Sequence, residues 1–143
     1  MITDHKGAIM TRDLEEVREH FKSDRYAYKI TGAVIDEVGD NWAVCSLKLT
    51  DDHKNARGQI MGGVMFTLAD FCFAVSSNND EVDTVTTVSQ ISYLRPIKGD
   101  AIYAKSRLIK DGTTTCFYEI MISDNTGHDV AYISMSGMHL KKK

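Results

Sequence analysis

The spacing of apolar residues predicts the helices and strands of this chain. Between residues 11 and 22, Leu14, Val17 and Phe21 lie three to four positions apart behind Thr11, so a short amphipathic helix with Thr11 as N-cap is expected. Six later stretches are rich in β-branched and aromatic residues, and they predict strands over residues 28–38, 42–50, 84–94, 101–109, 116–123 and 130–140. The turn at residues 39–41 favours a hairpin of the first two strands, and short turns favour an antiparallel meander of the last four.

Residues 61–77 are almost continuously apolar, and Asp70 is the one charged residue among them. A helix without a polar face is buried nearly all round. We therefore expect an antiparallel β-sheet wrapped around a long central helix, with a second subunit covering what the sheet leaves open. The predicted fold class is α+β, with an N-terminal helical segment over residues 1–25 and the main domain over residues 26–143.

Composition and charge narrow the functional classes. The chain has 143 residues, enough for one domain, and its net charge of −3 argues against binding to nucleic acid. Its longest apolar stretch is too short to span a membrane. The cysteines Cys45, Cys72 and Cys116 form no CxxC pair and are expected as small buried residues in a reducing compartment. The histidines form no ligand cluster, so no metal is expected. These features predict a cytoplasmic protein without a nucleic-acid or membrane partner.

The first candidate for chemistry is Asp70, because a carboxylate on a buried helix is costly unless it is paired, hydrogen-bonded or protonated. At 100° per residue, Asp70 shares one side of the helix with small or polar residues, namely Gly63, Thr67, Ala74 and Ser77. The opposite side carries Met65, Leu68, Cys72 and Val75. The small-residue side fits either close packing, with Asp70 hydrogen-bonded at a subunit interface, or a cleft with Asp70 at its floor.

The second candidate is Gly62-Gly63 at the start of the same helix. The first backbone N–H groups of a helix have no intrahelical partner and lie at the positive end of the helix dipole. Such an end can stabilise an oxyanion, and glycine lets a ligand approach the backbone closely. The same pair also suits a simple turn that directs the chain into the helix, and the two interpretations stay open.

The segment from His53 to Asp70, HKNARGQIMGGVMFTLAD, resembles the HxNxxGxxHGGxxxxLAD signature of PaaI-type hotdog-fold thioesterases, a group that includes the phenylacetyl-CoA thioesterases. The resemblance continues through residues 91–96, ISYLRP, and Gly99-Asp100, and covers roughly residues 30 to 140. It implies a hotdog fold and an acyl-CoA thioesterase that releases a carboxylic acid and CoA, with an aromatic or medium-chain acyl group.

The resemblance also implies roles for individual residues. Asp70 matches the general base or nucleophile, Gly62 the residue whose N–H polarises the thioester carbonyl, and Asn55 the residue that places the thioester or the attacking water. The family builds this site from two subunits, so a homodimer or homotetramer is implied. Residues expected to contact the acyl-CoA substrate are Gly63, a hydroxyl from either Thr86 or Thr87, and Arg95. No cofactor is implied, since CoA is part of the substrate.

One position departs from the signature: Met61 stands where the family has histidine. A thioether donates neither a hydrogen bond nor a proton. This departure keeps open a non-catalytic acyl-CoA-binding protein, and a hotdog dehydratase is the third alternative. Around the loop, His53 is expected as a solvated histidine, and Arg57 and Lys98 as surface charges that suit CoA phosphates. Cys72 is rejected as a nucleophile because it points to the packed side of the helix.

Overall fold

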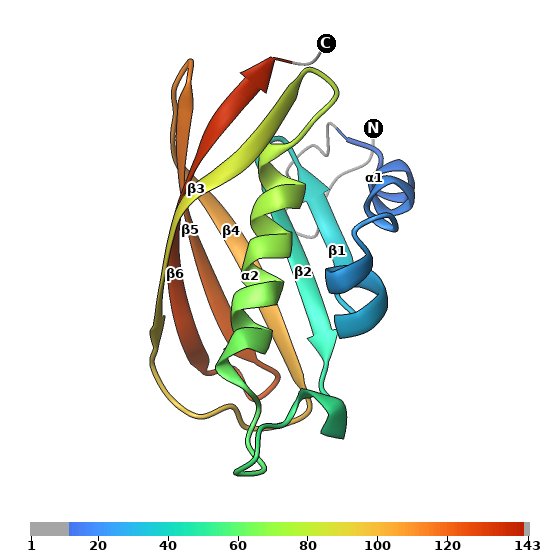
Figure 1. Cartoon of the computed structure of the whole chain (residues 1–143), viewed down its shortest axis with the longest axis vertical. Coiled ribbons are helices and arrows are strands. Elements are labelled where there is room, and N and C mark those ends of the chain that lie inside the picture. The colour runs from blue at the N-terminus through green and yellow to red at the C-terminus, as the bar shows by residue number, and fades with distance from the viewer. Residues whose placement is uncertain (1–11, 142–143) are drawn as a thin grey trace.

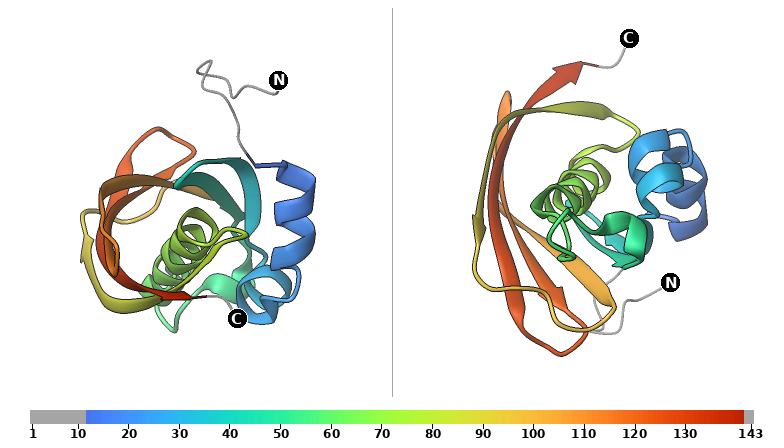
Figure 2. Two further views of the ribbon diagram at one scale, coloured as in Figure 1. Left: turned by 90° about the horizontal axis from the view of Figure 1, so that it is seen from above. Right: turned by 60° about the horizontal axis from the view of Figure 1, so that its bottom comes forward.

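The long helix α2 (Gly62–Ser77) lies in the hollow of one six-stranded antiparallel sheet (Figure 1). The computed structural model describes residues 12–141. The other elements, in chain order, are α1 (Leu14–Phe21), η1 (Arg25–Thr31), β1 (Val34–Gly39), β2 (Trp42–Lys48), η2 (Asp51–His53), β3 (Val82–Tyr93), β4 (Ala101–Asp111), β5 (Thr115–Asp124) and β6 (Asp129–Lys141). Seen from above, the sheet curls around α2 (Figure 2). The predicted α+β fold with an antiparallel sheet around a central helix is confirmed.

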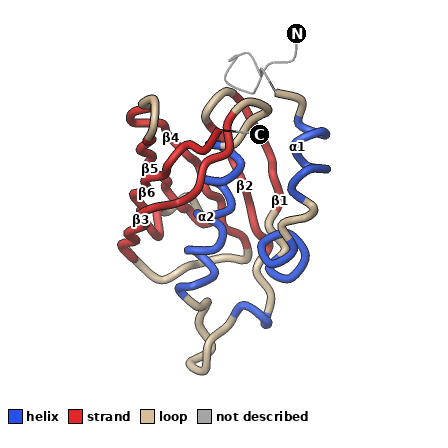
Figure 3. The backbone as a smooth tube through the Cα atoms, turned by 45° about the horizontal axis from the view of Figure 1, so that its top comes forward, coloured by secondary structure: helices blue, strands red, loops and turns tan. Residues whose placement is uncertain are grey.

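The strands lie in the order β1-β2-β4-β5-β6-β3, and every neighbouring pair is antiparallel. The predicted four-stranded meander is therefore wrong for β3, which pairs with β6 at an edge of the sheet instead of with β4. Residues 94–100, which contain Pro96, form a connection too long for a tight hairpin, so β4 pairs with β2. The tube in Figure 3 shows this connection, in tan, running from β3 to β4 past the lower half of α2.

Helix α2 is buried on one side and open on the other. Met65, Leu68, Cys72 and Val75 are buried against the sheet, which confirms the predicted packed side. Asp70 and Gly63 are exposed in a single copy of the chain, so burial nearly all round stays a prediction that depends on a second subunit. One flank of the helix therefore lacks a cover from its own sheet.

The core fills the space between α2 and the inner face of the sheet. Its largest fully buried side chains come from both layers: Leu47, Leu68, Phe73, Ile102, Ile120, Ile122 and Ile133. Cys45, Cys72 and Cys116 are buried within it as free thiols, as predicted. The three thiols therefore act as small core residues.

Helix α1 begins two residues later than the sequence indicated. The Asp13 side chain accepts the N–H of Glu16 at 2.9 Å and is the N-cap. Thr11, the predicted N-cap, lies outside the described residues. At the other end of α1, the rings of Phe21 and Phe71 meet edge to face with centroids 5.7 Å apart. This contact fixes α1 beside α2, while the proposed division of the chain near residue 25 stays a prediction.

The first strand begins later than predicted, because residues 25–31 form the π-helical segment η1. Gly32 has a φ of +94° and ends this segment, a conformation that favours glycine. The N–H groups of Gly32 and Ala33 both donate to the carbonyl of Ala27, at 3.1 and 2.9 Å. Residues 28–31, which were predicted to belong to the first strand, therefore form part of the helical segment, and β1 starts at Val34.

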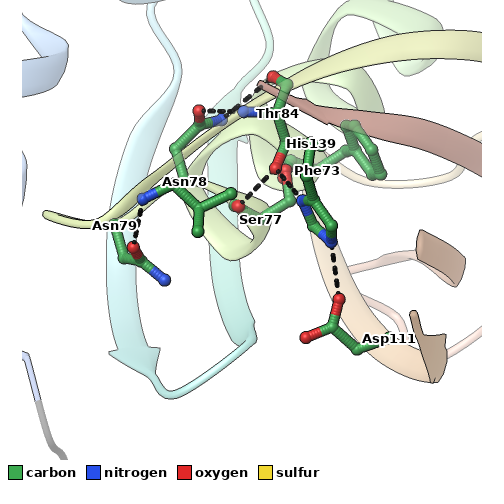
Figure 4. A network of polar contacts seen from close by, with 8 residues as sticks. Phe73, Ser77, Asn78, Asn79, Thr84, Asp111 and His139 are labelled. Atoms are coloured by element: carbon green, nitrogen blue, oxygen red, sulfur yellow. Dashed lines mark hydrogen bonds and ion pairs between the residues drawn. The ribbon is translucent and has the colours of Figure 1, made fainter. Parts of the chain in front are cut away.

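A network of polar contacts ties the end of α2 to the sheet (Figure 4). The Thr84 hydroxyl on β3 donates to the carbonyl of Ser77, the last residue of α2, at 2.8 Å. His139 on β6 bonds to the Thr84 hydroxyl through Nδ1 at 2.9 Å and to Asp111 through Nε2 at 2.7 Å. The Asn78 side chain accepts the N–H of Thr84 at 2.8 Å. This network satisfies an otherwise orphaned carbonyl at the helix end and fixes where β3 begins.

Candidate active site

Asp70 lies on the open flank of α2, close to β3. Loss of hydration raises the pKa of its carboxyl above the usual range, and the negative charge of Asp24 raises it further. A hydrogen bond with the Thr86 hydroxyl lowers the pKa and offsets part of this effect. A carboxylate with a raised pKa is a stronger proton acceptor, which suits a general base.

Asp24 comes from the segment between α1 and η1. It lies three residues beyond Phe21, whose ring contacts Phe71, the residue next to Asp70. The aromatic contact therefore holds the two carboxylates near each other. Sequence reasoning missed Asp24, because no spacing in the chain links residue 24 to the middle of a helix 46 positions later.

The structure separates the two candidate threonines. The register of β3 against β6 shifts between Thr86 and Val88, so Thr87 is the extra residue of a β-bulge. The Thr87 hydroxyl bonds to that of Ser136 at 3.0 Å. Thr86 instead meets Asp70. Of the two predicted hydroxyls, the structure brings Thr86 to the carboxylate and places Thr87 against β6.

The first turn of α2 starts at Gly62, and Met61 is its N-cap without a side-chain hydrogen bond. Met61 is 57% exposed, so its thioether reaches the surface next to the helix start. A Cβ on Gly63 would meet nothing within 4 Å, whereas a Cβ on Gly62 would lie 2.8 Å from the Tyr93 ring and hydroxyl oxygen. A side chain at position 62 would therefore displace the end of the Tyr93 side chain, whereas Gly63 leaves the helix start open to a ligand.

The side-chain oxygen of Asn55 closes the loop of residues 54–60. This carboxamide oxygen accepts the N–H of Arg57 at 2.9 Å and that of Gln59 at 3.2 Å. An antiparallel bridge between Lys54 and Ile60 draws the ends of the loop together. Because the oxygen is engaged, the NH₂ group is the part of Asn55 that can act on a ligand, as a donor.

His53 is not the solvated histidine that the sequence suggested. Its Nδ1 accepts the N–H of Thr50 at 2.9 Å, and its Nε2 lies 2.9 Å from the carbonyl of Thr31. A backbone N–H can only donate and a carbonyl can only accept, so the ring carries its proton on Nε2. The His53 carbonyl also accepts the N–H of Met61 at 2.9 Å. His53 therefore anchors the Asn55 loop at both ends.

A cavity of about 790 Å³ opens beside the start of α2. Its wall includes Gly62 and Met65 of α2, Tyr93 and Arg95, together with apolar residues from the two flanking loops, Leu49, Ile60, Leu94, Pro96 and Ile97. Lys54 is also in the wall, where its ammonium pairs with Asp51 at 2.7 Å, and Asp100 adds a further carboxylate. Lys98 lies instead in a separate hollow of about 230 Å³ with Asp124 and His128. Of the predicted phosphate ligands, Arg95 is thus the one that reaches the cavity beside Gly62.

A single copy does not bring the predicted catalytic residues together. Gly62 and Asp70 are eight positions apart on one straight helix, which places them about 12 Å apart along its axis. A carbonyl held at the N–H of Gly62 is therefore out of reach of Asp70 on the same helix. The structure contains two half-sites: the Gly62 half-site, which is the helix start with the cavity beside it, and the Asp70 half-site, which is Asp70 with Thr86. Asn55 lies in the loop before α2 and is not part of the cavity wall.

Among residues 12–141, no group of three or more His, Cys, Asp or Glu side chains is arranged to hold a metal ion. Within the same residues, no helix is long and apolar enough to cross a membrane.

Comparison with known proteins identifies the family. The family model described as the thioesterase superfamily matches residues 57–131, about half of the chain. Acyl-coenzyme A thioesterase PaaI of Escherichia coli is 30% identical over 104 residues, which cover 72% of this chain and 74% of that protein. Its solved structure superposes with a TM-score of 0.79 at 24% identity, over 92% of this chain and 99% of that chain. The chain belongs to the thioesterase superfamily and has its hotdog fold.

Two further proteins resemble the chain over most of their lengths. Human acyl-coenzyme A thioesterase 13 is 26% identical over 136 residues, 92% of this chain and 95% of that protein. A thioesterase structure from Streptococcus pneumoniae TIGR4, solved with coenzyme A, superposes with a TM-score of 0.78 at 24% identity, over 86% of this chain and 98% of that chain. The predicted resemblance to PaaI-type hotdog thioesterases is thereby confirmed.

Proposed function

We propose that the protein is an acyl-CoA thioesterase that hydrolyses the thioester to a carboxylic acid and CoA. The observation that carries this proposal is the pair of half-sites on α2: a glycine helix start that opens beside a cavity of about 790 Å³, and a base-like Asp70 on the open flank. The names of the relatives support the substrate class, since PaaI and human thioesterase 13 are both acyl-coenzyme A thioesterases.

The working unit that we propose is a homodimer, either alone or paired into a homotetramer. Asp70 of one copy then serves the Gly62 half-site of the other, which removes the separation of about 12 Å within one helix. The unpaired edge strand β3 supports this assembly, because a long exposed edge is a template for pairing with another chain. Pairing there would bring a second copy against the open flank of α2.

In the proposed mechanism the thioester carbonyl oxygen accepts the N–H of Gly62, where the helix dipole stabilises the developing negative charge. Asp70 either removes a proton from a water molecule that attacks the carbonyl carbon, or attacks that carbon itself and is released by water. In both routes the C–S bond breaks, the sulfur leaves as the thiol of CoA, and the acyl group leaves as the acid. Asn55 orients the thioester or the water through its NH₂ group. The reaction consists of proton transfer, addition to the carbonyl and expulsion of the sulfur, which takes up the proton removed from water, so we propose that it needs no metal or redox cofactor.

The remaining substrate contacts are also proposals. Arg95 suits the phosphates of CoA because its guanidinium forms paired hydrogen bonds with phosphate oxygens. The apolar lining from Ile60, Met65 and Ile97 suits an aromatic or medium-chain acyl group. The three buried free thiols fit a reducing compartment, so we place the protein in the cytoplasm.

A non-catalytic acyl-CoA-binding protein is the rival, and Met61 is the observation that favours it, since the family histidine is a polar group that this chain lacks. A dehydratase is disfavoured because α2 carries no histidine. The test is thiol release from a panel of acyl-CoAs by the wild-type protein and by Asp70→Asn. Release by the wild type and its loss in the variant support the thioesterase; tight binding without release by the wild type would establish the rival.

A further inference from the structure

Tyr93, the last residue of β3, lies over the first residue of α2. A Cβ built on Gly62 would stand 2.8 Å from both the ring carbon Cζ and the hydroxyl oxygen of Tyr93. In a helix the Cα–Cβ bond tilts toward the N-terminus. The Tyr93 hydroxyl therefore lies at the N-terminal end of α2, the end toward which the first N–H groups point.

The backbone fixes this position. Tyr93 pairs with Ala131 of β6, and the next residue, Leu94, donates its N–H to the carbonyl of Val130 at 2.9 Å. Successive side chains of a strand point to opposite faces, so the Tyr93 side chain lies on the face opposite to Ser92. This is the face of Ile91, which is directed toward the helix. The ring is thus held by a paired strand end and not by a free loop.

Tyr93 and Gly62 also line the same cavity of about 790 Å³, and Tyr93 is 53% exposed. A ligand in this cavity whose oxygen reaches the N–H of Gly62 therefore lies within reach of the Tyr93 hydroxyl as well. A phenolic hydroxyl is a hydrogen-bond donor, which the thioether of Met61 is not. The structure thus offers a polar donor at the place where this chain lacks the histidine of its family.

We propose that the Tyr93 hydroxyl is a second hydrogen-bond donor to the thioester carbonyl oxygen, beside the N–H of Gly62. The inference rests on the proposed thioesterase function and adds a residue to its site. The hydroxyl keeps its proton throughout: it donates a hydrogen bond that strengthens as negative charge develops on the oxygen and weakens when the C–S bond has broken. Its contribution is therefore to the transition state more than to substrate binding.

The test compares wild type with Tyr93→Phe, which keeps the ring over Gly62 and removes the donor. We expect kcat to fall about 10²-fold with KM little changed, the effect of removing one such donor. The control is Tyr103→Phe, because Tyr103 is an exposed tyrosine on β4 outside the cavity wall, and its loss should leave kcat unchanged. Adding Met61→His to Tyr93→Phe should restore part of the lost turnover, because it returns a donor beside the helix start.

A kcat of Tyr93→Phe within threefold of wild type would overturn the role of Tyr93 while leaving the thioesterase function intact. Absence of thiol release by the wild type would overturn the proposed function and, with it, this inference. If Tyr93→Phe melts well below wild type, the comparison passes to Tyr93→His, whose ring retains a donor. Higher kcat in the His variant than in the Phe variant supports the inference, and equal kcat values overturn it.

Discussion

At the scale of single residues, the position of Asp70 makes its ionised form costly. Its pKa is raised because dehydration and the charge of Asp24 both disfavour the ionised form, and the Thr86 hydroxyl offsets only part of this. A carboxyl whose folded pKa lies above its unfolded value binds its proton more tightly in the folded state. Folding stability is therefore lost as the pH rises through the range between the two values. Such a cost is typical of a residue kept for chemistry.

Asp70→Asn separates a catalytic from a structural role. The amide keeps the size of the side chain but cannot accept a proton, so we expect kcat to fall by about 10² to 10⁴-fold. The melting temperature at neutral pH should stay level or rise, because the cost of ionising Asp70 disappears. Thiol-release kinetics and thermal melting measure the two effects, with Asp129→Asn, an exposed carboxyl at the start of β6, as control. An active but destabilised Asp70→Asn protein would contradict the catalytic role.

Asp24→Asn should change the pH dependence of the reaction. Removing the negative charge of Asp24 lowers the pKa of Asp70, since that charge is one of the two causes that raise it. A base must be deprotonated to act, so the acid limb of the profile of log kcat/KM against pH should move to lower pH. The measurement is the pH profile of both proteins, and an unmoved acid limb would show that Asp24 does not act on Asp70. A purely structural loss would lower the whole profile without moving its limb.

The sequence located some of these residues and missed others for physical reasons. Asp70 and Gly62 stand out because a charge in an apolar helix and a glycine pair before it are local signals. The choice between Thr86 and Thr87 depends on a bulge, and no pattern in the strand marks its position. The anchoring role of His53 depends on the carbonyl of Thr31, 22 residues away. Tyr93 had a usable signal, because it lies two positions after Ile91 and so shares the helix-facing side of the strand with it.

At the scale of elements, the composition of residues 61–77 is enough to predict α2, whereas the place of β3 in the sheet depends on the rest of the fold. An apolar run of helix length predicts α2 to within a residue at its start. The pattern of β3 predicts that a strand exists, but pairing with β6 instead of β4 follows from the length of the connection at residues 94–100. The π-helical segment η1 replaces part of a predicted strand because Gly32 ends the turn in a left-handed conformation. The local sequence pattern thus predicts whether a segment is a helix or a strand, whereas the order of the strands in the sheet depends on tertiary pairing.

The two glycines that start α2 should respond oppositely to substitution by alanine. Gly62→Ala places a Cβ 2.8 Å from the end of the half-exposed Tyr93 side chain, which must move aside, so we expect a loss at the low end of overpacking costs, about 1 kcal/mol. Gly63→Ala meets nothing within 4 Å and should stabilise the protein by up to about 1 kcal/mol, because alanine favours helix. Urea denaturation of the two variants gives the free energies of unfolding. Equal changes in the free energy of unfolding would mean that Tyr93 leaves enough space for a side chain at position 62.

The end of α2 should depend on Thr84. Thr84→Val keeps the shape of the side chain but leaves the carbonyl of Ser77 and the ring of His139 without their shared partner. Because Thr84 is buried, we expect the free energy of unfolding to fall by about 1–3 kcal/mol. Thr115→Val, at an exposed strand start, is the matched control in the same denaturation experiment. A loss no larger than that of the control would show that the network in Figure 4 contributes little to stability.

At the scale of the whole molecule, pairing of two chains would account for both the open flank of α2 and the unpaired edge of β3. The sheet covers one side of the helix, and the other side carries the carboxylate that its own Gly62 half-site cannot use. A symmetric pair of chains solves both problems at once, since a two-fold axis gives each Asp70 the half-site of the other copy. Light scattering should therefore find at least a dimer at micromolar concentration, and a folded monomer would contradict a site shared between copies.

Shared sites make a sharper prediction for mixed assemblies. Asp70→Asn and Asn55→Ala chains, each inactive alone, can be co-expressed with different affinity tags and purified as the mixed dimer. If each site takes Asp70 from one copy and Asn55 from the other, the mixed dimer contains one intact site and one doubly altered site, so it should recover about half of the wild-type activity per dimer. If each chain carries its own complete site, both sites of the mixed dimer carry one substitution, and activity stays at the level of the single variants. Thiol release by the purified mixed dimer therefore decides whether the distance of about 12 Å between Gly62 and Asp70 is bridged by a second copy.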